Sequence, residues 1–465
     1  MAATRTLASV WAAKGTAFAS RALGRGGGTA AGGLVGTWLQ PRLIAELASH
    51  LGHGSIVITG TNGKTTTSLL VSDTARAAGL EPLANASGSN LVRGIASTLA
   101  LAAGTDGRLR DAPNRLGVFE VDEATVPLVL GDLNPRALVF TNLFRDQLDR
   151  YGEVAAVAAL WRRMLAGAPA ALTLVLNADD PAVASLGEGR ERVVYFGVED
   201  RKLDRGAPDH AADALSCTVC GTRLEYAVAY FGHFGHWRCP GCGRARPKPD
   251  VAARLVNLKD GRSARFQLGV EGHKGMVDLR LGGLYNVYNA LAAAAAARAL
   301  DLPLEASIEA IEGVHAAFGR QEAFEVDGRR VELFLGKNPA GLNQVLSTLL
   351  LNESRRTALI ILNDGIADGR DVSWVWDADF ELAAGKLEQV VTSGTRAAEM
   401  ALRLKYAEWD EGSIEVDPTI PRALDRALAL TQPGECLTVV PTYTAMLTVR
   451  ELLAKRAGVA PFWRA

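Results

Sequence analysis

Short apolar runs alternate with helix-compatible segments along most of the chain. In the first half, runs that indicate buried strands occupy residues 55–59, 117–121, 137–141 and 172–176. Helical patterns separate these runs, which favours an α/β fold with a parallel sheet covered by helices. The same alternation returns later, with strands expected at 357–362, 387–392 and 436–440. The pattern therefore predicts a second α/β domain after the first.

The segments before and between these elements divide the chain further. Residues 1–50 are expected to form a helical lead that contains a glycine-rich turn over 24–33. Residues 51–318 then form the first α/β domain, and residues 319–465 form the C-terminal one. An insert at about 203–250, rich in cysteine, proline and aromatic residues, interrupts the first domain.

The bulk composition is that of an ordinary soluble enzyme. At 465 residues, the chain has room for two or three domains. Hydrophobic residues make up 48% and charged residues 22%, and the formal net charge of −1 gives no overall attraction to nucleic acid or anionic membranes. No apolar run reaches the eighteen residues of a membrane span. An amphipathic helix expected at 7–22 carries Lys14 and Arg21, unlike a signal peptide, so the cytoplasm is the expected location.

Four of the five cysteines form two matched pairs. Cys217 and Cys220 are followed by Cys239 and Cys242, and each pair has the two-residue spacing of a metal knuckle. Four thiolates complete a tetrahedral shell, so we expect a structural Zn²⁺ that stabilises the insert. A redox Cys-x-x-Cys pair is the alternative. Cys436 lies in a mostly apolar run and is expected to be a buried strand residue.

The composition of the insert also fits an alternative function, the binding of a ligand without catalysis. Arg238, Arg244, Arg246 and Lys248 lie near the cysteines and several aromatic residues, a composition that suits binding of a nucleic-acid strand. No extended basic face accompanies them, so we expect no nucleic-acid partner.

The stretch from residue 56 to residue 67 has the form of a phosphate-binding loop. A β-rich run ends in a turn that contains Gly60 and Gly63, and a helix-compatible segment follows. Backbone N–H groups of such a loop approach phosphate oxygens, Lys64 would reach the β- and γ-phosphates, and the Thr65 hydroxyl would help to hold Mg²⁺. The general pattern has a glycine five residues before Gly63, where this chain has Ile58, so the loop is a variant.

A group of carboxylates follows the next predicted strand. Glu120, Asp122 and Glu123 come at the carboxyl end of that strand, beside the loop in a parallel sheet. A carboxylate there can hold the Mg²⁺ that bridges nucleotide phosphates, and we favour Glu120. The alternative is a solvated acidic turn.

The loop string Gly-Thr-Asn-Gly-Lys-Thr-Thr resembles the ATP loop of the Mur ligases and of the related folylpolyglutamate synthases. Both families activate a carboxylate with ATP and join it to an amine. The resemblance implies that ATP is held by Gly60, Thr61, Asn62, Gly63, Lys64, Thr65 and Thr66.

Three later strings extend the same resemblance. Residues 177–181 match the family's Asn-Ala-Asp-Asp-Pro turn, and the segment with Asn286 and Asn289 resembles the one that meets adenine. Arg320 lies in a string that resembles the hinge into the last domain, whose arginine closes over the phosphates. Without the resemblance, residues of this kind indicate turns and helix caps.

Two departures from the Mur pattern concern the metal ligands. Gln147 stands where those ligases have a histidine that helps to hold a second Mg²⁺, so a second metal is in doubt. Most of them also have a carbamylated lysine in the following helix, but no lysine occurs between Tyr151 and Asp200. The matching position falls near 161–163, where an arginine would hold a phosphate but not a metal.

The four-cysteine insert and three strings of the last domain narrow the resemblance to the MurT family. These strings lie at 337–344, 368–377 and 441–446. The resemblance implies a heterodimer with a GatD-like glutaminase subunit. It also implies amidation of the α-carboxylate of D-glutamate in the stem peptide of lipid II, with ATP and glutamine, at the inner face of the membrane.

A further residue role comes with this resemblance. An aspartate of the string at 368–377 is thought to complete the Cys/His pair of the partner, because an imidazole is oriented by a carboxylate within hydrogen-bond reach. We choose Asp371, with Asp368 and Asp377 left open, and a capped loop is the alternative. This chain shows no convincing Cys/His nucleophile pair of its own, so ammonia must come from elsewhere.

The competing hypothesis is an amino-acid-adding ligase of the Mur or folylpolyglutamate type. Residues 1–50 are too few for the usual UDP-binding first domain of the Mur type, and the missing lysine also argues against it.

Overall fold

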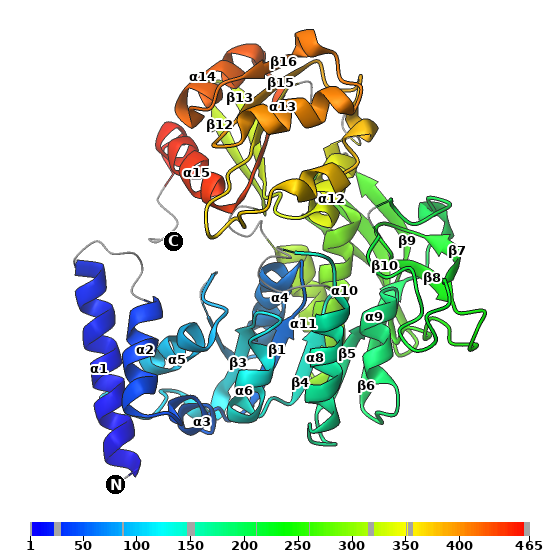
Figure 1. Cartoon of the computed structure of the whole chain (residues 1–465). Coiled ribbons are helices and arrows are strands. Elements are labelled where there is room, and N and C mark those ends of the chain that lie inside the picture. Colours follow the sequence, from blue (N-terminus) through cyan, green and yellow to red (C-terminus); the bar gives the residue numbers. More distant parts are fainter. Residues whose placement is uncertain are drawn as a thin grey trace.

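The computed structural model describes residues 2–22, 29–85, 88–146, 154–210, 212–259, 261–314, 320–349, 351 and 357–459. Two large sheets, each packed against helices, lie in separate parts of the chain (Figure 1). The cores of the two sheets consist of separate sets of buried residues. We therefore propose that residues 51–318 and 319–465 are the two domains.

The first sheet contains the predicted parallel strands. Its nine strands follow the order β11-β10-β9-β6-β5-β4-β1-β3-β2, and every neighbouring pair from β9 to β2 is parallel. The parallel strands are β1 (Ser55–Thr59), β2 (Glu81–Ala84), β3 (Arg115–Glu120), β4 (Ala137–Phe140), β5 (Thr173–Asn177), β6 (Val193–Val198) and β9 (Val251–Lys259). The four strands that the sequence predicted match β1, β3, β4 and β5 to within two residues.

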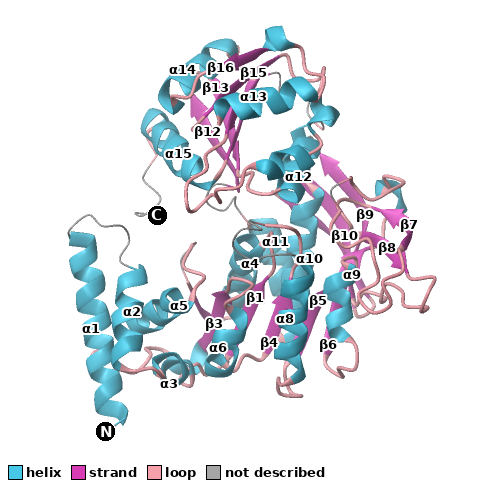
Figure 2. Ribbon diagram, in the orientation of Figure 1, coloured by secondary structure: helices cyan, strands magenta, loops and turns pink. Residues whose placement is uncertain are grey.

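Helices cover both faces of this sheet (Figure 2). Successive residues of a strand point to opposite faces, so Ile56 and Ile58 of β1 enter one core and Val57 enters the other. The first core is covered by α4 (Lys64–Ala77), α10 (Leu284–Ala299) and α11 (Leu304–Gly313). The second is covered by α3 (Leu43–Ala48), α5 (Val92–Ala102), α6 (Val126–Leu133), α8 (Val154–Ala166) and α9 (Pro181–Ala184).

An antiparallel extension of the sheet was not predicted. Strands β9, β10 (Ser263–Val270) and β11 (His273–Leu279) form an antiparallel meander at one edge. Their buried and exposed positions alternate over much of their length, with Arg254 and Arg265 among the polar residues in the strands. Such half-exposed strands lack the continuous apolar run that marks a strand buried on both faces.

The insert forms a small hairpin beside the sheet. Strands β7 (Glu225–Ala229) and β8 (Gly235–Arg238) pair antiparallel between β6 and β9 in the chain, and Figure 1 places them at one end of the molecule. A short helix ends at Leu203 before the insert, and β9 starts at Val251 after it, so we keep the proposed insert limits of about 203–250.

The N-terminal lead is helical, as predicted, but its turn is shorter than expected. Helix α1 (Ala2–Ala22) packs against α2 (Thr29–Leu39), so the glycine-rich turn over 24–33 was wrong for residues 29–33. These glycines serve close packing. A Cβ atom on Gly32 would lie 2.8 Å from the Ala13 carbonyl oxygen, and one on Gly33 would lie 1.7 Å from that of Arg93 in α5. Within the described ranges, no helix combines the length and apolar character needed to cross a membrane.

The second sheet has six strands in the order β12-β13-β17-β14-β15-β16. They are β12 (Arg320–Val326), β13 (Arg329–Phe334), β14 (Thr357–Ile361), β15 (Gln389–Ser393), β16 (Ile414–Val416) and β17 (Cys436–Pro441). All pairs except β12 with β13 are parallel. The packed helices are α12 (Pro339–Leu349), α13 (Ala397–Tyr406), α14 (Ile420–Leu430) and α15 (Tyr443–Ala457). Cys436 is buried at the start of β17, which confirms its predicted position.

Candidate active site

The predicted phosphate loop connects the end of β1 to the start of α4. Gly60 and Gly63 adopt φ angles of 127° and 86°, a region that favours glycine. Gly63 also touches a second element, because a Cβ atom there would lie 2.1 Å from Oδ1 of Asn289 in α10. The loop is therefore shaped both by backbone conformation and by the helix that packs on it.

Lys64 is buried at the base of this loop. Its Nζ donates to the carbonyl oxygens of Gly60 at 2.5 Å and Thr61 at 3.4 Å, and it lies 3.2 Å from Oε2 of Glu123. Burial by itself lowers the pKa of Lys64, but the nearby carboxylates, Glu123 foremost and then Glu120, raise it overall. The ammonium group thus stays charged inside the protein. The sequence placed Glu123 in the acidic string, residues 120–123, but it did not single out Glu123 as the partner of Lys64.

Thr65 and Glu120 meet across the loop. The Thr65 hydroxyl donates to Glu120 Oε2 at 2.8 Å, and Glu120 is itself buried. The backbone of Glu120 is held by Asn85, whose amide both accepts from its N–H and donates to its carbonyl oxygen at 2.9 Å. A hydroxyl and a carboxylate brought together beside a phosphate loop form a suitable Mg²⁺ site.

Residues after β4 support the loop from the other side. The side-chain oxygen of Asn142 accepts from the Asn62 N–H at 2.8 Å, and the Asn142 amide nitrogen donates to the Asn62 carbonyl oxygen at 2.9 Å. The Thr141 hydroxyl donates to the same oxygen at 2.8 Å. Gln147, the predicted replacement for a metal-binding histidine, lies outside the described residues.

A tryptophan lies at the start of the region, 161–163, where the resemblance predicted the counterpart of a metal-binding lysine. Trp161 of α8 is fully buried, packs on Phe140 with ring centroids 4.7 Å apart, and donates from its indole nitrogen to the Glu123 carbonyl oxygen at 3.0 Å. Arg162 and Arg163 are exposed, and the expectation that an arginine here holds a phosphate stays a prediction. The indole braces the acidic string that contacts Lys64.

A pocket opens beside the loop, and several parts of the chain form its wall, among them the segment after β4 with Thr141, Asn142 and Phe144. The loop and α10 contribute Asn62, Gly63, Thr66, Tyr285, Tyr288 and Asn289, and the C-terminal domain contributes Phe334, Lys337 and Gln344. Phe231 and Phe234, between β7 and β8 of the insert, complete the wall. Asn289 donates to Asn286 at 3.1 Å, and Asn286 donates to the Gly282 carbonyl oxygen at 2.8 Å, so Asn286 lies behind the wall. The insert aromatics were not predicted to lie here.

The C-terminal domain touches the loop directly. The side-chain amides of Asn62 and Asn338 exchange hydrogen bonds of 3.3 and 3.1 Å, and Lys337 forms an ion pair with Asp146. Arg320 opens β12, but its side chain lies outside the described part of the structure, as do Phe318 and Gly319. The neighbouring Gln321 does line the pocket.

The three candidate aspartates of the C-terminal domain have different surroundings. Asp368 is buried and accepts from the Thr444 N–H at 2.7 Å, at the start of α15. Asp377 lies 3.1 Å from the guanidinium of Arg145. Asp371 is exposed, and hydrogen bonds from the side chain and N–H of Ser373 lower its pKa. A hollow between the domains brings Asp371 near Asp146 and Lys337.

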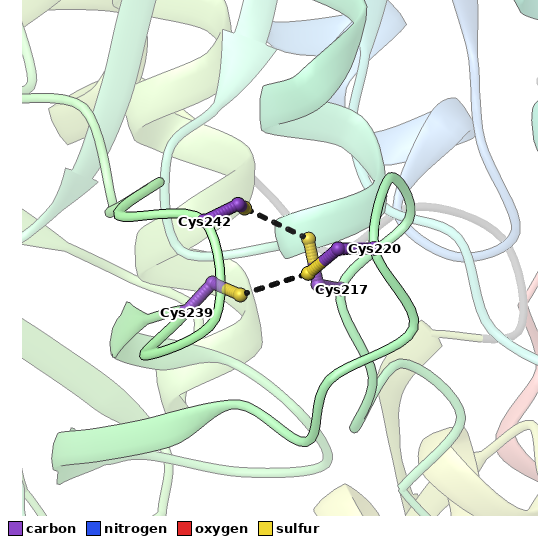
Figure 3. Close-up of side chains that lie close together, drawn as sticks. All are labelled: Cys217, Cys220, Cys239 and Cys242. Atoms are coloured by element: carbon purple, nitrogen blue, oxygen red, sulfur yellow. Dashed lines mark hydrogen bonds between the residues drawn. The ribbon is translucent and has the colours of Figure 1, made fainter.

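The four paired cysteines come together as predicted (Figure 3). Their sulfur atoms all lie within 4.8 Å of one another, with 3.6 Å between Cys217 and Cys242 and 3.4 Å between Cys220 and Cys239. Thiolates bound to one Zn²⁺ at 2.3 Å in a tetrahedron lie about 3.8 Å apart, so the cluster fits that ion. Within the cluster, hydrogen bonds from Thr222 lower the pKa of Cys220 to about 6, whereas burial raises the pKa of Cys239 to about 11.

Comparison with known proteins agrees with this architecture. Residues 58–236 match the family model for the Mur ligase middle domain, and residues 335–446 match the model for the MurT ligase C-terminal region. A pseudomurein peptide ligase type C from Methanothermus fervidus has a similar structure, with a TM-score of 0.66 and 24% identity over 89% of this chain and 81% of that one. MurF from Acinetobacter baumannii gives 0.65 and 16%, over 91% and 80%. The fold and the site define an ATP-dependent ligase of the Mur type.

Two curated relatives narrow the assignment from Mur-type ligases in general to one family. The MurT subunit of lipid II isoglutaminyl synthase (glutamine-hydrolyzing) from Staphylococcus aureus strain COL is 32% identical over 439 residues, which cover 94% of each chain. The subunit of the same name from Streptococcus pneumoniae R6 is 31% identical, over 97% of this chain and 98% of the relative. The chain belongs to the MurT family.

The buried pair of Lys64 and Glu123 leads to a first prediction. Replacing Lys64 by Met leaves the Glu123 carboxylate buried without its cation, and we expect a loss of about 3 kcal/mol in the free energy of unfolding. The double variant Lys64→Met/Glu123→Gln should recover most of this loss but still fail to bind ADP. Urea unfolding and titration calorimetry measure the two effects. Equal instability of the single and double variants would contradict the pairing, and ADP binding by the double variant would contradict the role of Lys64.

The contact between Gly63 and Asn289 leads to a second prediction. Gly63→Ala should weaken ADP binding at least about tenfold, because the loop must move away from α10 and leave its left-handed conformation. Gly79→Ala is the matched control, since Gly79 has a φ of 80° with no atom within 4 Å of the added Cβ. We expect this control to lose about 1 kcal/mol of stability and to bind ADP normally. Similar ADP affinities in the two variants would show that the contact with Asn289 is unimportant.

Proposed function

We propose that this chain is the synthase subunit that amidates the α-carboxylate of D-glutamate in the lipid II stem peptide, with ATP as the energy source. Its membership of the MurT family supports the reaction, because the curated relatives are named as subunits of lipid II isoglutaminyl synthase. The observation that carries the assignment is the loop site, where Lys64, Thr65 and Glu120 converge at the mouth of a parallel sheet.

In this proposal, the loop holds the ATP phosphates and the pocket holds the base. Backbone N–H groups of residues 60–66 and the Lys64 ammonium face the phosphates, with Asn289 in the pocket wall beside the base. Asn286 would position the Asn289 side chain through their hydrogen bond, and Arg320 is proposed to close over the phosphates. Thr65 and Glu120 would hold a Mg²⁺ ion, which neutralises the charge that builds up on the transferred phosphate.

The proposed reaction then proceeds in two nucleophilic displacement steps. The substrate carboxylate oxygen attacks the γ-phosphorus of ATP, so that ADP leaves and an acyl phosphate forms. Ammonia next attacks the acyl carbon, phosphate leaves, and the nitrogen loses a proton to give the amide. The contacts of the C-terminal domain with the loop, through Asn338 and Lys337, would help to exclude water from the acyl phosphate.

The proposed ammonia source is a GatD-like glutaminase subunit in a heterodimer. Within the described structure, the cysteines of this chain do not supply the nucleophile, because four of them form the metal cluster and Cys436 is buried in β17. Asp371 is proposed to orient the imidazole of the partner. Asp371 is exposed and can reach a partner, whereas Asp368 is buried, and Asp371 lines a hollow with Asp146 and Lys337.

The proposal also covers the cellular location of the chain and the metal bound by the insert. Because lipid II is a membrane-bound precursor, we place the chain in the cytoplasm, working at the inner face of the membrane. The four cysteines are proposed to hold a structural Zn²⁺, since four thiolates leave no open coordination position.

The role of Asp371 can be tested in the purified complex with its glutaminase subunit. Asp371→Asn should lose glutamine-dependent amidation by about a hundredfold or more, while amidation with added ammonium salt survives. The mass change of lipid II, from acid to amide, measures both reactions.

Two neighbouring variants serve as controls. Asp377→Asn is expected to preserve both reactions, and Asp368→Asn to impair both, because Asp368 caps the start of α15. If Asp371→Asn lost both reactions equally, Asp371 would belong to the ATP chemistry. A selective loss in Asp377→Asn would move the partner contact to that residue.

A further inference from the structure

The insert reaches the proposed nucleotide pocket through the tip of its hairpin. Phe231 and Phe234 lie in the turn between β7 and β8 and line the pocket. Their rings pack against each other with centroids 4.7 Å apart, and the Phe234 ring lies 5.0 Å from that of Tyr288 in α10. Phe144, which follows β4, stacks on Phe234 at 5.1 Å. The wall of the pocket is therefore an aromatic cluster that the insert completes.

The other end of the same hairpin is held by the four cysteines. Cys217 and Cys220 precede β7, and Cys239 and Cys242 follow β8, so one metal ion bound by all four would join the two strands at their open end. Few apolar residues support this end. The small buried cluster there consists of Ala184, Cys217, Leu224, Trp237 and Cys239. The tip is different, because Val228, Tyr230, Phe231 and Phe234 are buried in the main core of the first domain. The cysteine end is therefore the part of the insert that depends most on a metal.

Direct bonds connect the metal end of the insert to the pocket helix. Trp237, two residues before Cys239, donates from its indole nitrogen to the Ala178 carbonyl oxygen at 3.0 Å. Arg246, four residues after Cys242, forms an ion pair with the buried carboxylate of Asp179. The other oxygen of that carboxylate accepts from the Tyr288 hydroxyl at 2.6 Å. Asp179 thus holds an insert arginine on one side and a tyrosine of the pocket wall on the other.

From this arrangement we infer that metal occupancy of the four-cysteine site controls the nucleotide affinity of the pocket. The inference rests on the proposed nucleotide-binding function. Without the metal, the hairpin loses the cross-link at its cysteine end, so that Arg246 and, through Asp179 and Tyr288, the aromatic wall of Phe231 and Phe234 are held less firmly in the binding shape. Any such coupling is reciprocal, so nucleotide must tighten metal binding by the same factor by which metal tightens nucleotide binding.

The first experiment uses the full-length chain with its zinc. Zinc is released with an organomercurial reagent, quantified with a colorimetric chelator, and restored after the reagent is removed by excess thiol. We expect ADP affinity, measured by calorimetry, to fall about 5- to 150-fold on zinc removal and to return on zinc addition. Unchanged ADP affinity in zinc-free protein would overturn the coupling between zinc and nucleotide but not the proposed nucleotide-binding function. Failure of the zinc-loaded chain to bind ADP would overturn the proposed function together with the coupling.

The second experiment measures the reciprocal effect. In competition with a chelator of known zinc affinity, ADP should raise the zinc affinity of the chain by the factor found in the first experiment. The Lys64→Met variant, which we expect not to bind ADP, controls for direct binding of zinc by ADP. A shift in that variant equal to the wild-type shift, or no shift in the wild type, would contradict the inference.

A substitution at the hairpin tip tests the path without disturbing the metal. Phe231→Leu should keep a full zinc content and weaken ADP binding about fivefold or more, because it removes part of the aromatic wall. Phe266→Leu is the matched control, since Phe266 in β10 is buried in the same core but does not line the pocket. Equal weakening of ADP binding in the two variants would indicate a general packing effect and would overturn the assigned path.

Discussion

The active site depends on keeping the Lys64 ammonium charged inside the protein. A buried cation is tolerated only where carboxylates and carbonyl oxygens compensate the loss of water. Here Glu123 supplies the opposite charge, and the Gly60 carbonyl oxygen accepts a hydrogen bond from the same nitrogen. This requirement ties the end of β1 to the acidic string after β3, and Trp161 holds that string through its backbone. The loop, the acidic residues after β3 and a helix on the far side of the sheet are thus linked around one charged group.

Three separate parts of the chain complete the site around this centre. Helix α10 approaches the loop so closely that Gly63 has no room for a side chain, and the C-terminal domain contacts Asn62 through Asn338. The insert adds the aromatic wall. Since each part supplies residues that line or support the pocket, a shift of any of them would change its shape. The proposed coupling between the four-cysteine site and the pocket depends on this shared construction.

Trp161 contributes packing and position to the site rather than charge. Its indole is fully buried and donates to the backbone carbonyl oxygen of Glu123. The carboxylates that face the loop in the described structure come from residues 120–123, after β3.

The sequence alone determined the features that depend on local pattern. Buried parallel strands appear as continuous apolar runs, so β1, β3, β4, β5, β14, β15 and β17 were predictable nearly to the residue. The phosphate loop and the cysteine pairs were predictable because their chemistry requires fixed spacing within a few residues. The half-exposed strands β9 to β11 were not, because alternation with polar residues is a weaker signal. Gly32 and Gly33 indicated a turn, although they serve helix contact.

Only the tertiary structure decided which residues meet across long stretches of chain. It chose Glu123 as the partner of Lys64, put Trp161 rather than an arginine behind the site, and brought Phe231 to the pocket. It also separated Asp371, which is exposed, from Asp368, which caps a helix. These outcomes follow from packing between elements that are distant in sequence, and packing depends on the shape of the whole core rather than on neighbouring residues.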